Sequence, residues 1–491
     1  MTVALAIPTV ETASYLCSCG GTLQLHHMDD LKLEWFKCSK CGDQKNKSQL
    51  ELLPRKEFIA SLEATDEELS QEFTLEELNR ILSLMIKGDD SIKEILFLVS
   101  LLTFTDSEQT GAIITGETSL GKTYNIREVL WFFSTLDVNG KQVVDWQAGA
   151  SAKSFIHRRN AEFVDVDTLQ PIDYSLAPKK GDPAEMFTAW NKVLKSAGYL
   201  LDYSQKIFVL PDMDNTDLLK VLRPILSHDK KISKFSITEK VPNGFRTKDV
   251  LIKGFFTIFF ATATTYIDEQ EASRHFLLSP KDDQEKMKQS IDLIARKSYD
   301  TNFADWYEND PDRVKLKKRV AAIQAFKCSE IVISQELTES LKEWFLSKTS
   351  FINPKLQRDF PRLLSLVKAW TLFNWKNRQT GKRYVLQSTQ ADVDVAKVLY
   401  GDILSCNELG ITPEEYEIWT MVKDVCDDGL SVSAIHDLFY KHKKRNISDK
   451  RLRGILKNFC RAGLLREEKN GTTWIYYPAD VESQPKEGWI D

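Results

Sequence analysis

The chain has 491 residues, of which 42% are hydrophobic and 28% charged, and its formal net charge is -5. Such a length exceeds what one hydrophobic core supports, so we expect several domains of a soluble globular protein. The small net charge excludes a uniformly basic surface, so any contact with nucleic acid depends on local patches. The longest apolar runs are shorter than the ~20 residues needed to cross a bilayer, and no signal peptide is visible. We therefore expect an intracellular, cytoplasmic protein without membrane contact.

Four of the eight cysteines lie near the N-terminus, in the stretches CSCGG and CSKCG. Their C-x-C-x18-C-x2-C spacing is typical of two turns that face each other around a tetrahedral zinc ion. The intervening segments TLQLHH and LKLEWFK alternate like two strands, which predicts a zinc ribbon. Unrelated free thiols or disulfides are the alternative. The predicted Zn²⁺ ligands are Cys17, Cys19, Cys38 and Cys41.

The stretch TGETSLGKTYN contains a G-x-x-x-x-G-K-T motif. An apolar run, GAIIT, precedes it and a segment with helical periodicity, YNIREVLWFFSTL, follows it. This strand–loop–helix context is the one in which backbone amides surround the phosphates of ATP, Lys122 reaches the β and γ phosphates, and Thr123 binds Mg²⁺. The predicted nucleotide-binding residues are Gly116, Glu117, Thr118, Ser119, Leu120, Gly121, Lys122, Thr123 and, from a later strand, Thr262.

Two later apolar segments end in polar residues. KIFVLPDMDN ends in two acids, which predicts a Mg²⁺ ligand at Asp212 and activation of water by Asp214. An ordinary strand with an Asx turn is the alternative. FFTIFFATATT ends in threonines, of which Thr262 is suited to sense the γ phosphate. Together with GAIIT, these segments predict a parallel sheet covered by helices, and hence a multidomain α/β fold.

Between these two segments, KISKFSITEKVPNGFRTKDVLIKG alternates on both sides of a Pro-Asn-Gly turn, which predicts a β-hairpin. Cations next to an aromatic ring combine phosphate attraction with base stacking, as in contacts with single-stranded DNA. A surface hairpin with ordinary lysines is the alternative. The predicted DNA-binding residues are Lys240, Phe245, Arg246 and Lys248.

A hairpin at this place resembles the clade of AAA+ ATPases that includes the minichromosome-maintenance (MCM) helicases of archaea and mobile elements. RDFPRLLSLVKAWTLFNWKNR and STQADVDVAKVLY resemble the lid helices of that family, and by motif order the resemblance covers roughly residues 80–402. Met213 departs from the family pattern, which has glutamate there. The resemblance implies that Arg362 contacts the γ phosphate. It also implies a homo-oligomeric ring in which Arg274, or else Arg223, is an arginine finger; a structural ion pair is the alternative for either.

The C-terminal region predicts three helices, in TPEEYEIWTMVKDVC, SVSAIHDLFYKH and SDKRLRGILKNFCRAGLL, and a hairpin in LLREEKNGTTWIYYP. This combination predicts a winged helix, a variant of the helix-turn-helix. The basic stretch 441–461 is typical of binding to duplex DNA by counterion release. A winged helix that contacts protein is the alternative. The predicted DNA contacts are Lys450, Arg451, Arg453 and Lys457.

The expected organisation is a zinc ribbon (1–48), an acidic linker and helix (49–79), an AAA+ core (80–300), a helical lid (301–404), a winged helix (405–480) and a tail (481–491). The predicted function is ATP-dependent translocation or unwinding of DNA in replication of a chromosome or mobile element, with single-stranded DNA in the ring and duplex at the winged helix. An ATP-dependent initiator or switch without unwinding activity is the alternative. The basic hairpin favours the motor, and the irregular acidic motif favours the switch.

Overall fold

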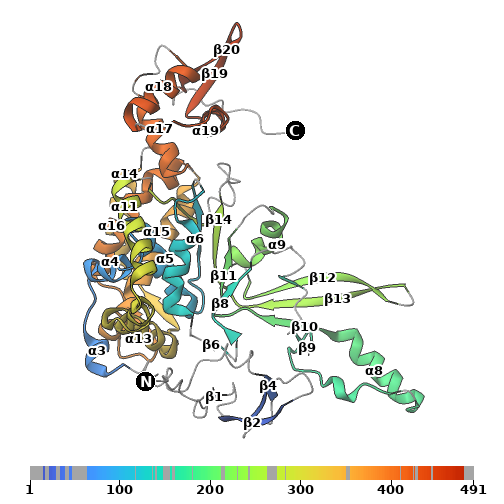
Figure 1. The fold of residues 1–491 in the computed structure, drawn as a ribbon. Helices are drawn as coiled ribbons and strands as arrows, with labels where there is room; N and C mark the ends of the chain where they lie inside the picture. The colour runs from blue at the N-terminus through green and yellow to red at the C-terminus, as the bar shows by residue number, and fades with distance from the viewer. Residues whose placement is uncertain are drawn as a thin grey trace, which may run out of the picture.

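A computed structural model of the chain shows a parallel sheet flanked by helices, a second sheet that continues into an arm, and a module of helices and short strands at the C-terminal end (Figure 1). No described helix is long and apolar enough to cross a membrane. The residues described are 15–16, 22–28, 34–38, 44–46 and 64–479, the last range with gaps at 117, 135–136, 139–140, 148–154, 157–160, 180, 212–215, 229, 242–243, 263–273, 282, 350–353, 410, 424, 426–428 and 444–445.

Five parallel strands form the central sheet, in the order β15–β5–β14–β11–β8. The strand β14 lies between β5 and β11, so the carboxyl ends of the three predicted motif strands are neighbours. The prediction of an α/β protein with a parallel sheet is therefore confirmed. The strands are β5 (Gly111–Thr115), β8 (Val144–Trp146), β11 (Ile207–Leu210), β14 (Thr257–Thr262) and β15 (Phe276–Leu278).

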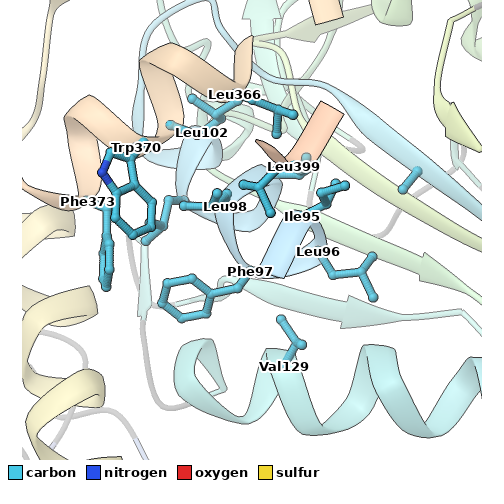
Figure 2. Packing of buried hydrophobic residues seen from close by; sticks show 14 of the residues in the cluster. Ile95, Leu96, Phe97, Leu98, Leu102, Val129, Leu366, Trp370, Phe373 and Leu399 are labelled. Atoms are coloured by element: carbon cyan, nitrogen blue, oxygen red, sulfur yellow. The ribbon is translucent and has the colours of Figure 1, made fainter. Parts of the chain in front are cut away.

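Both faces of this sheet are buried, which explains why its strands are continuous apolar runs. In β5, Ala112 and Ile114 belong to one core, whereas Ile113 belongs to the other. Figure 2 shows the first core, where Phe97 lies near Trp370 and Phe373. The helices that cover this face are α5 (Asp90–Leu101), α6 (Lys122–Leu130), α15 (Leu356–Phe373) and α16 (Gln390–Leu409).

The opposite face packs against α9 (Thr216–Leu226) and against a second sheet, of order β12–β13–β10–β9. The two long strands of this second sheet, β12 and β13, pair antiparallel, and Val241 is opposite Gly244. The predicted hairpin is therefore present. This hairpin and α8 (Ala184–Ser196) extend away from the central sheet (Figure 1). The strands are β9 (Glu162–Asp165), β10 (Ala197–Asp202), β12 (Ile232–Val241) and β13 (Gly244–Lys253).

Helices dominate the regions before β5 and after β15. Thr74 caps the N-terminus of α4, because its Oγ1 accepts a hydrogen bond of 3.1 Å from the amide of Glu77. The two segments that resemble lid helices form α15 and α16, which pack against each other. The remaining elements are α3 (Asp66–Ser70), α4 (Leu75–Ser83), β6 (Asp137–Val138), β7 (Lys141–Gln142), α11 (Gln284–Tyr299), α12 (Phe303–Asn309), α13 (Pro311–Phe326), β16 (Glu330–Val332), α14 (Gln335–Lys348) and β17 (Val385–Gln387).

Residues 411–479, here called the C-terminal module, have a hydrophobic core of their own. The three predicted helices are present and pack on a three-stranded antiparallel sheet. The predicted hairpin is present: Asn470 pairs with Thr473, so the turn consists of Gly471 and Thr472, and Gly471 supplies the left-handed φ of 62°. The elements are α17 (Pro413–Lys423), β18 (Leu430–Ser431), α18 (Val432–Lys443), α19 (Asp449–Arg461), β19 (Leu465–Asn470) and β20 (Thr473–Pro478).

The N-terminal region contains a four-stranded antiparallel sheet, of order β1–β2–β3–β4. The predicted strand TLQLHH is present, and the described part of the second predicted segment, LKLEWFK, belongs to β3, whereas its first three residues lie outside the described ranges. The backbone of Cys38 ends β3; Cys17, Cys19 and Cys41 lie outside the described residues. The strands are β1 (Tyr15–Leu16), β2 (Thr22–Met28), β3 (Glu34–Cys38) and β4 (Gln44–Asn46).

Candidate nucleotide-binding site

The loop between β5 and α6 has the backbone conformation of an anion site. Ser119 and Gly121 have positive φ angles of 73° and 90°, and Gly121 caps the N-terminus of α6. Left-handed residues in a short loop turn successive N–H groups toward one side and form a concavity that favours an anion. The first amides of α6 and its dipole add to this preference. The residues present therefore fit a bound phosphate.

The side chain of Lys122 connects the two ends of this loop. Its Nζ donates a hydrogen bond of 2.7 Å to the carbonyl oxygen of Gly116. The next residue, Thr123, is exposed, and its role as a Mg²⁺ ligand stays a prediction. Glu117 lies outside the described residues. The cation and the hydroxyl expected to contact the nucleotide therefore both lie at the start of α6.

Sequence reasoning missed Asp89, a buried carboxylate behind the loop. It accepts hydrogen bonds from Lys286 Nζ at 2.6 Å, Asn125 Nδ2 at 2.8 Å and the amide of Lys281 at 2.9 Å. The same ammonium of Lys286 donates to the carbonyl oxygen of Leu120, at 3.2 Å. Asp89 thus fixes the loop to α6, to α11 and to the segment after β15. In the sequence, Asp89 and Asp90 precede an apolar run, a pattern that predicts a helix cap; Asp89 makes no such cap with its side chain, so this signal does not identify its role.

On the other side of the loop lies the end of β14. Thr262 pairs with Thr115, the residue directly before Gly116, and is buried with 2% exposure. The predicted sensor threonine is therefore adjacent to the strand that leads into the loop. Asp212 and Asp214 lie outside the described residues, and the preceding strand β11 ends at Leu210.

Arg362 does not lie where the resemblance to MCM proteins implies. Its side chain donates to the carbonyl oxygen of His275, to the carboxylate of Asp359 and, at 2.9 Å, to Asn407 Oδ1. His275 directly precedes β15 and is level with Gly111, so this network lies at the amino edge of the sheet.

The phosphate loop leaves the opposite edge, and five residues of β5 separate the two edges by about 16 Å. Arg362 is also only 5% exposed. We therefore correct its role: the observed position does not fit a contact with the γ phosphate, and Arg362 acts within a buried structural network.

The two arginine-finger candidates lie in different places. Arg274 precedes His275 at the amino edge of the sheet, away from the phosphate loop of its own chain. Arg223 lies on α9, against the other face of the sheet. Both assignments stay predictions.

The predicted DNA-binding residues of the hairpin lie along its two strands. The backbone register places Lys240 opposite Phe245 and Arg246 opposite Glu239. Their side chains lie outside the description. Lys248 is nearer the base of the hairpin, where its Nζ lies 4.8 Å from the ring centroid of Tyr199 on β10.

Helix α19 carries two kinds of basic residue. Lys450, Arg453 and Lys457 are exposed, and their spacing places them on one face of the helix, here called the basic face. Arg451 is different, because its side chain is 19% exposed and its guanidinium pairs with the carboxylate of Glu414 on α17. The four predicted DNA contacts therefore do not form one surface.

The chain matches no protein-family model, and no curated protein sequence matches it significantly. Within the described ranges, no group of three or more His, Cys, Asp and Glu side chains is arranged to hold a metal ion. Function is therefore inferred from the phosphate loop and its neighbours.

Proposed function

We propose that this protein is an ATP-driven DNA translocase or helicase of the MCM-like AAA+ type. The observation that carries the proposal is the phosphate loop, with left-handed residues at Ser119 and Gly121, between a buried parallel strand and a helix that begins at Lys122. The order of the sheet supports it further, because β14 with Thr262 lies between the loop strand and the strand that precedes Asp212.

In this proposal, bound ATP with Mg²⁺ supplies the reactive phosphate. Lys122 stabilises charge on the phosphates, and Thr123 and Asp212 hold the metal. Thr262 positions a polar group next to the loop. Asp214 orients the attacking water, in place of the glutamate that the family pattern has at the position of Met213.

Two surfaces would contact DNA. The hairpin of β12 and β13 extends away from the sheet, as a contact inside a ring requires, and Lys248 contributes a cation at its base (Figure 1). The basic face of α19 would bind duplex phosphates. The C-terminal module would then be a winged helix. The N-terminal antiparallel sheet, in which Cys38 is the last residue of β3, supports the proposal of a structural Zn²⁺ site held by the four cysteines of this part of the sequence.

A second candidate is an ATP-dependent initiator or switch without unwinding activity. The position of Arg451 and Glu414 favours it, because both line a small cavity with Thr115 and Gly116 at the start of the phosphate loop. Such a contact suits a protein whose DNA-binding module responds to nucleotide. Strand displacement distinguishes the two candidates, since a switch binds and hydrolyses ATP without separating strands.

We expect Lys122→Ala to abolish ATP hydrolysis, because the charge that develops on the phosphates loses its cation. Such a loss typically raises the activation barrier by ~3–4 kcal/mol. ATP hydrolysis is measured with and without single-stranded DNA, together with displacement of a forked duplex. The control is Lys342→Ala, an exposed lysine of α14. Unchanged turnover in Lys122→Ala, or a wild-type protein that neither hydrolyses ATP nor separates strands, contradicts the motor.

A further inference from the structure

The C-terminal module lies beside the start of the phosphate loop of its own chain, and residues of both line one small cavity. A cavity of about 10 Å³, roughly the size of one water molecule, separates Thr115 and Gly116 from Glu414, Arg451 and Ile455. The helices α17 and α19 therefore lie at the position from which a nucleotide in the loop would be contacted.

The start of α17 is fixed firmly at this position. Thr412 and Glu415 form a reciprocal cap, in which each backbone amide donates to the side chain of the other, at 2.8 and 3.2 Å. Glu415 is buried, and its Oε1 accepts a hydrogen bond of 3.0 Å from Asn458 on α19. Both helices are thus held together beside the loop, and they carry Glu414 and Arg451 with them.

The charges at this contact are arranged in an unusual way for a phosphate site. The side chain of Glu414 is 16% exposed, and its carboxylate pairs with Arg451. A triphosphate in the loop brings several negative charges close to this carboxylate. An arginine binds phosphate oxygens in the same bidentate geometry as it binds a carboxylate. The nucleotide and Glu414 therefore compete for one guanidinium.

We propose that Arg451 exchanges Glu414 for the terminal phosphate of a bound triphosphate, so that the C-terminal module senses the nucleotide of its own chain. This inference rests on the proposed nucleotide site. Arg362 is buried at the other edge of the sheet and does not contact the terminal phosphate, so another arginine is needed for that contact. Because α19 also carries the basic face, nucleotide occupancy and duplex affinity are coupled, and the coupling acts equally in both directions.

The test compares the dissociation constants of ATP and of ADP, by calorimetry, for the wild type, Arg451→Gln, Glu414→Gln and the double variant. We expect Arg451→Gln to raise the dissociation constant of ATP about tenfold, which corresponds to about 1.4 kcal/mol. The dissociation constant of ADP should rise by less than about twofold. Glu414→Gln removes the carboxylate that competes for Arg451, so the dissociation constant of ATP should fall. Lys342→Gln, at an exposed lysine of α14 outside both proposed binding sites, is the control and leaves both constants unchanged.

The double variant separates two explanations and leaves no half-buried charge without its partner. If Arg451 binds phosphate, the double variant has a lower affinity for ATP than Glu414→Gln, and also a lower affinity than the wild type. If Arg451 merely neutralises Glu414, the double variant regains the affinity of the wild type, and the proposal is overturned. Equal weakening of ATP and ADP, or no weakening by Arg451→Gln, overturns it as well. A wild type without affinity for ATP defeats the nucleotide site itself, which is a separate result.

Discussion

At the scale of single residues, the pair of Arg362 and Asp359 shows how burial determines the role of a charge. Both side chains are almost fully buried, with exposures of 5% and 1%. Removal of one partner leaves the other charge in a low-dielectric environment, which is costly, whereas the intact pair contributes little to net stability.

We therefore expect Arg362→Ala to lower the free energy of unfolding by about 3–5 kcal/mol. The affinity of the folded fraction for ATP should remain unchanged, because the loop lies at the other edge of the sheet. Urea unfolding and ATP titration of the same samples measure the two effects. A variant of normal stability that has lost ATP affinity would restore the role implied by the family resemblance.

His275 gives a prediction for the dependence of stability on pH. Burial, with a smaller contribution from Arg362 and Arg274, lowers the pKa of His275 from 6.5 to about 3. Between these values the unfolded chain binds a proton that the folded chain does not, so the stabilising contribution is complete above pH 6.5 and is lost as the pH falls. The expected loss is about 1.4 kcal/mol per pH unit.

The variant His275→Gln lacks this titration. Its unfolding by urea, compared with that of the wild type between about pH 7.5 and pH 5, should show the smaller dependence on pH. Parallel curves for the two proteins would mean that His275 is accessible to protons in the folded state.

At the scale of elements, α19 presents different residues to two environments. Its buried side chains, among them Leu452, Ile455 and Phe459, pack in the core of the module, while the basic face is exposed. Because Arg451 lies off this face, its contribution can be separated from that of Arg453 and Lys457.

The double charge reversal Arg453→Glu, Lys457→Glu should weaken duplex binding and reduce its salt dependence. Loss of two phosphate contacts lowers the slope of log affinity against log salt by about 2. Fluorescence anisotropy at several salt concentrations measures both quantities, with Lys342→Glu on α14 as the control. Duplex affinity equal to that of the control would assign this face to protein contacts.

At the scale of the whole molecule, features set by local sequence could be predicted. The strands GAIIT and FFTIFFAT, the hairpin of β12 and β13, and the three C-terminal helices follow from periodicity and turn residues within a short window. The place of the phosphate loop between strand and helix follows from its glycines and its flanking segments, whereas the left-handed φ of Ser119 does not.

Features set by tertiary packing could not be predicted. The sequence does not show that Arg362 faces the amino edge of the sheet, because that depends on how α15 packs against β15 and α16. Nor does the sequence show that Arg451 lies beside the phosphate loop, since Arg451 and Lys450 are adjacent in α19 and yet lie on different faces of the helix. Asp89 was missed because two of its partners, Lys281 and Lys286, lie nearly 200 residues further along the chain.

The hairpin offers the most direct test of the claim that ATP drives movement on DNA. The hairpin of β12 and β13 belongs to a different sheet from the strand that precedes the phosphate loop. Removal of side chains from the hairpin should therefore leave ATP binding intact. Each lost stacking or phosphate contact removes about 1–3 kcal/mol of affinity for the strand. Duplex binding by α19 should hardly change.

The decisive measurement is strand displacement of a forked duplex per ATP hydrolysed, in the wild type and in Lys240→Ala, Phe245→Ala, Lys248→Ala. We expect the variant to bind ATP as before, to hydrolyse it with less stimulation by single-stranded DNA, and to displace still less strand per ATP. A variant that separates strands at the rate of the wild type would contradict the motor and leave the switch.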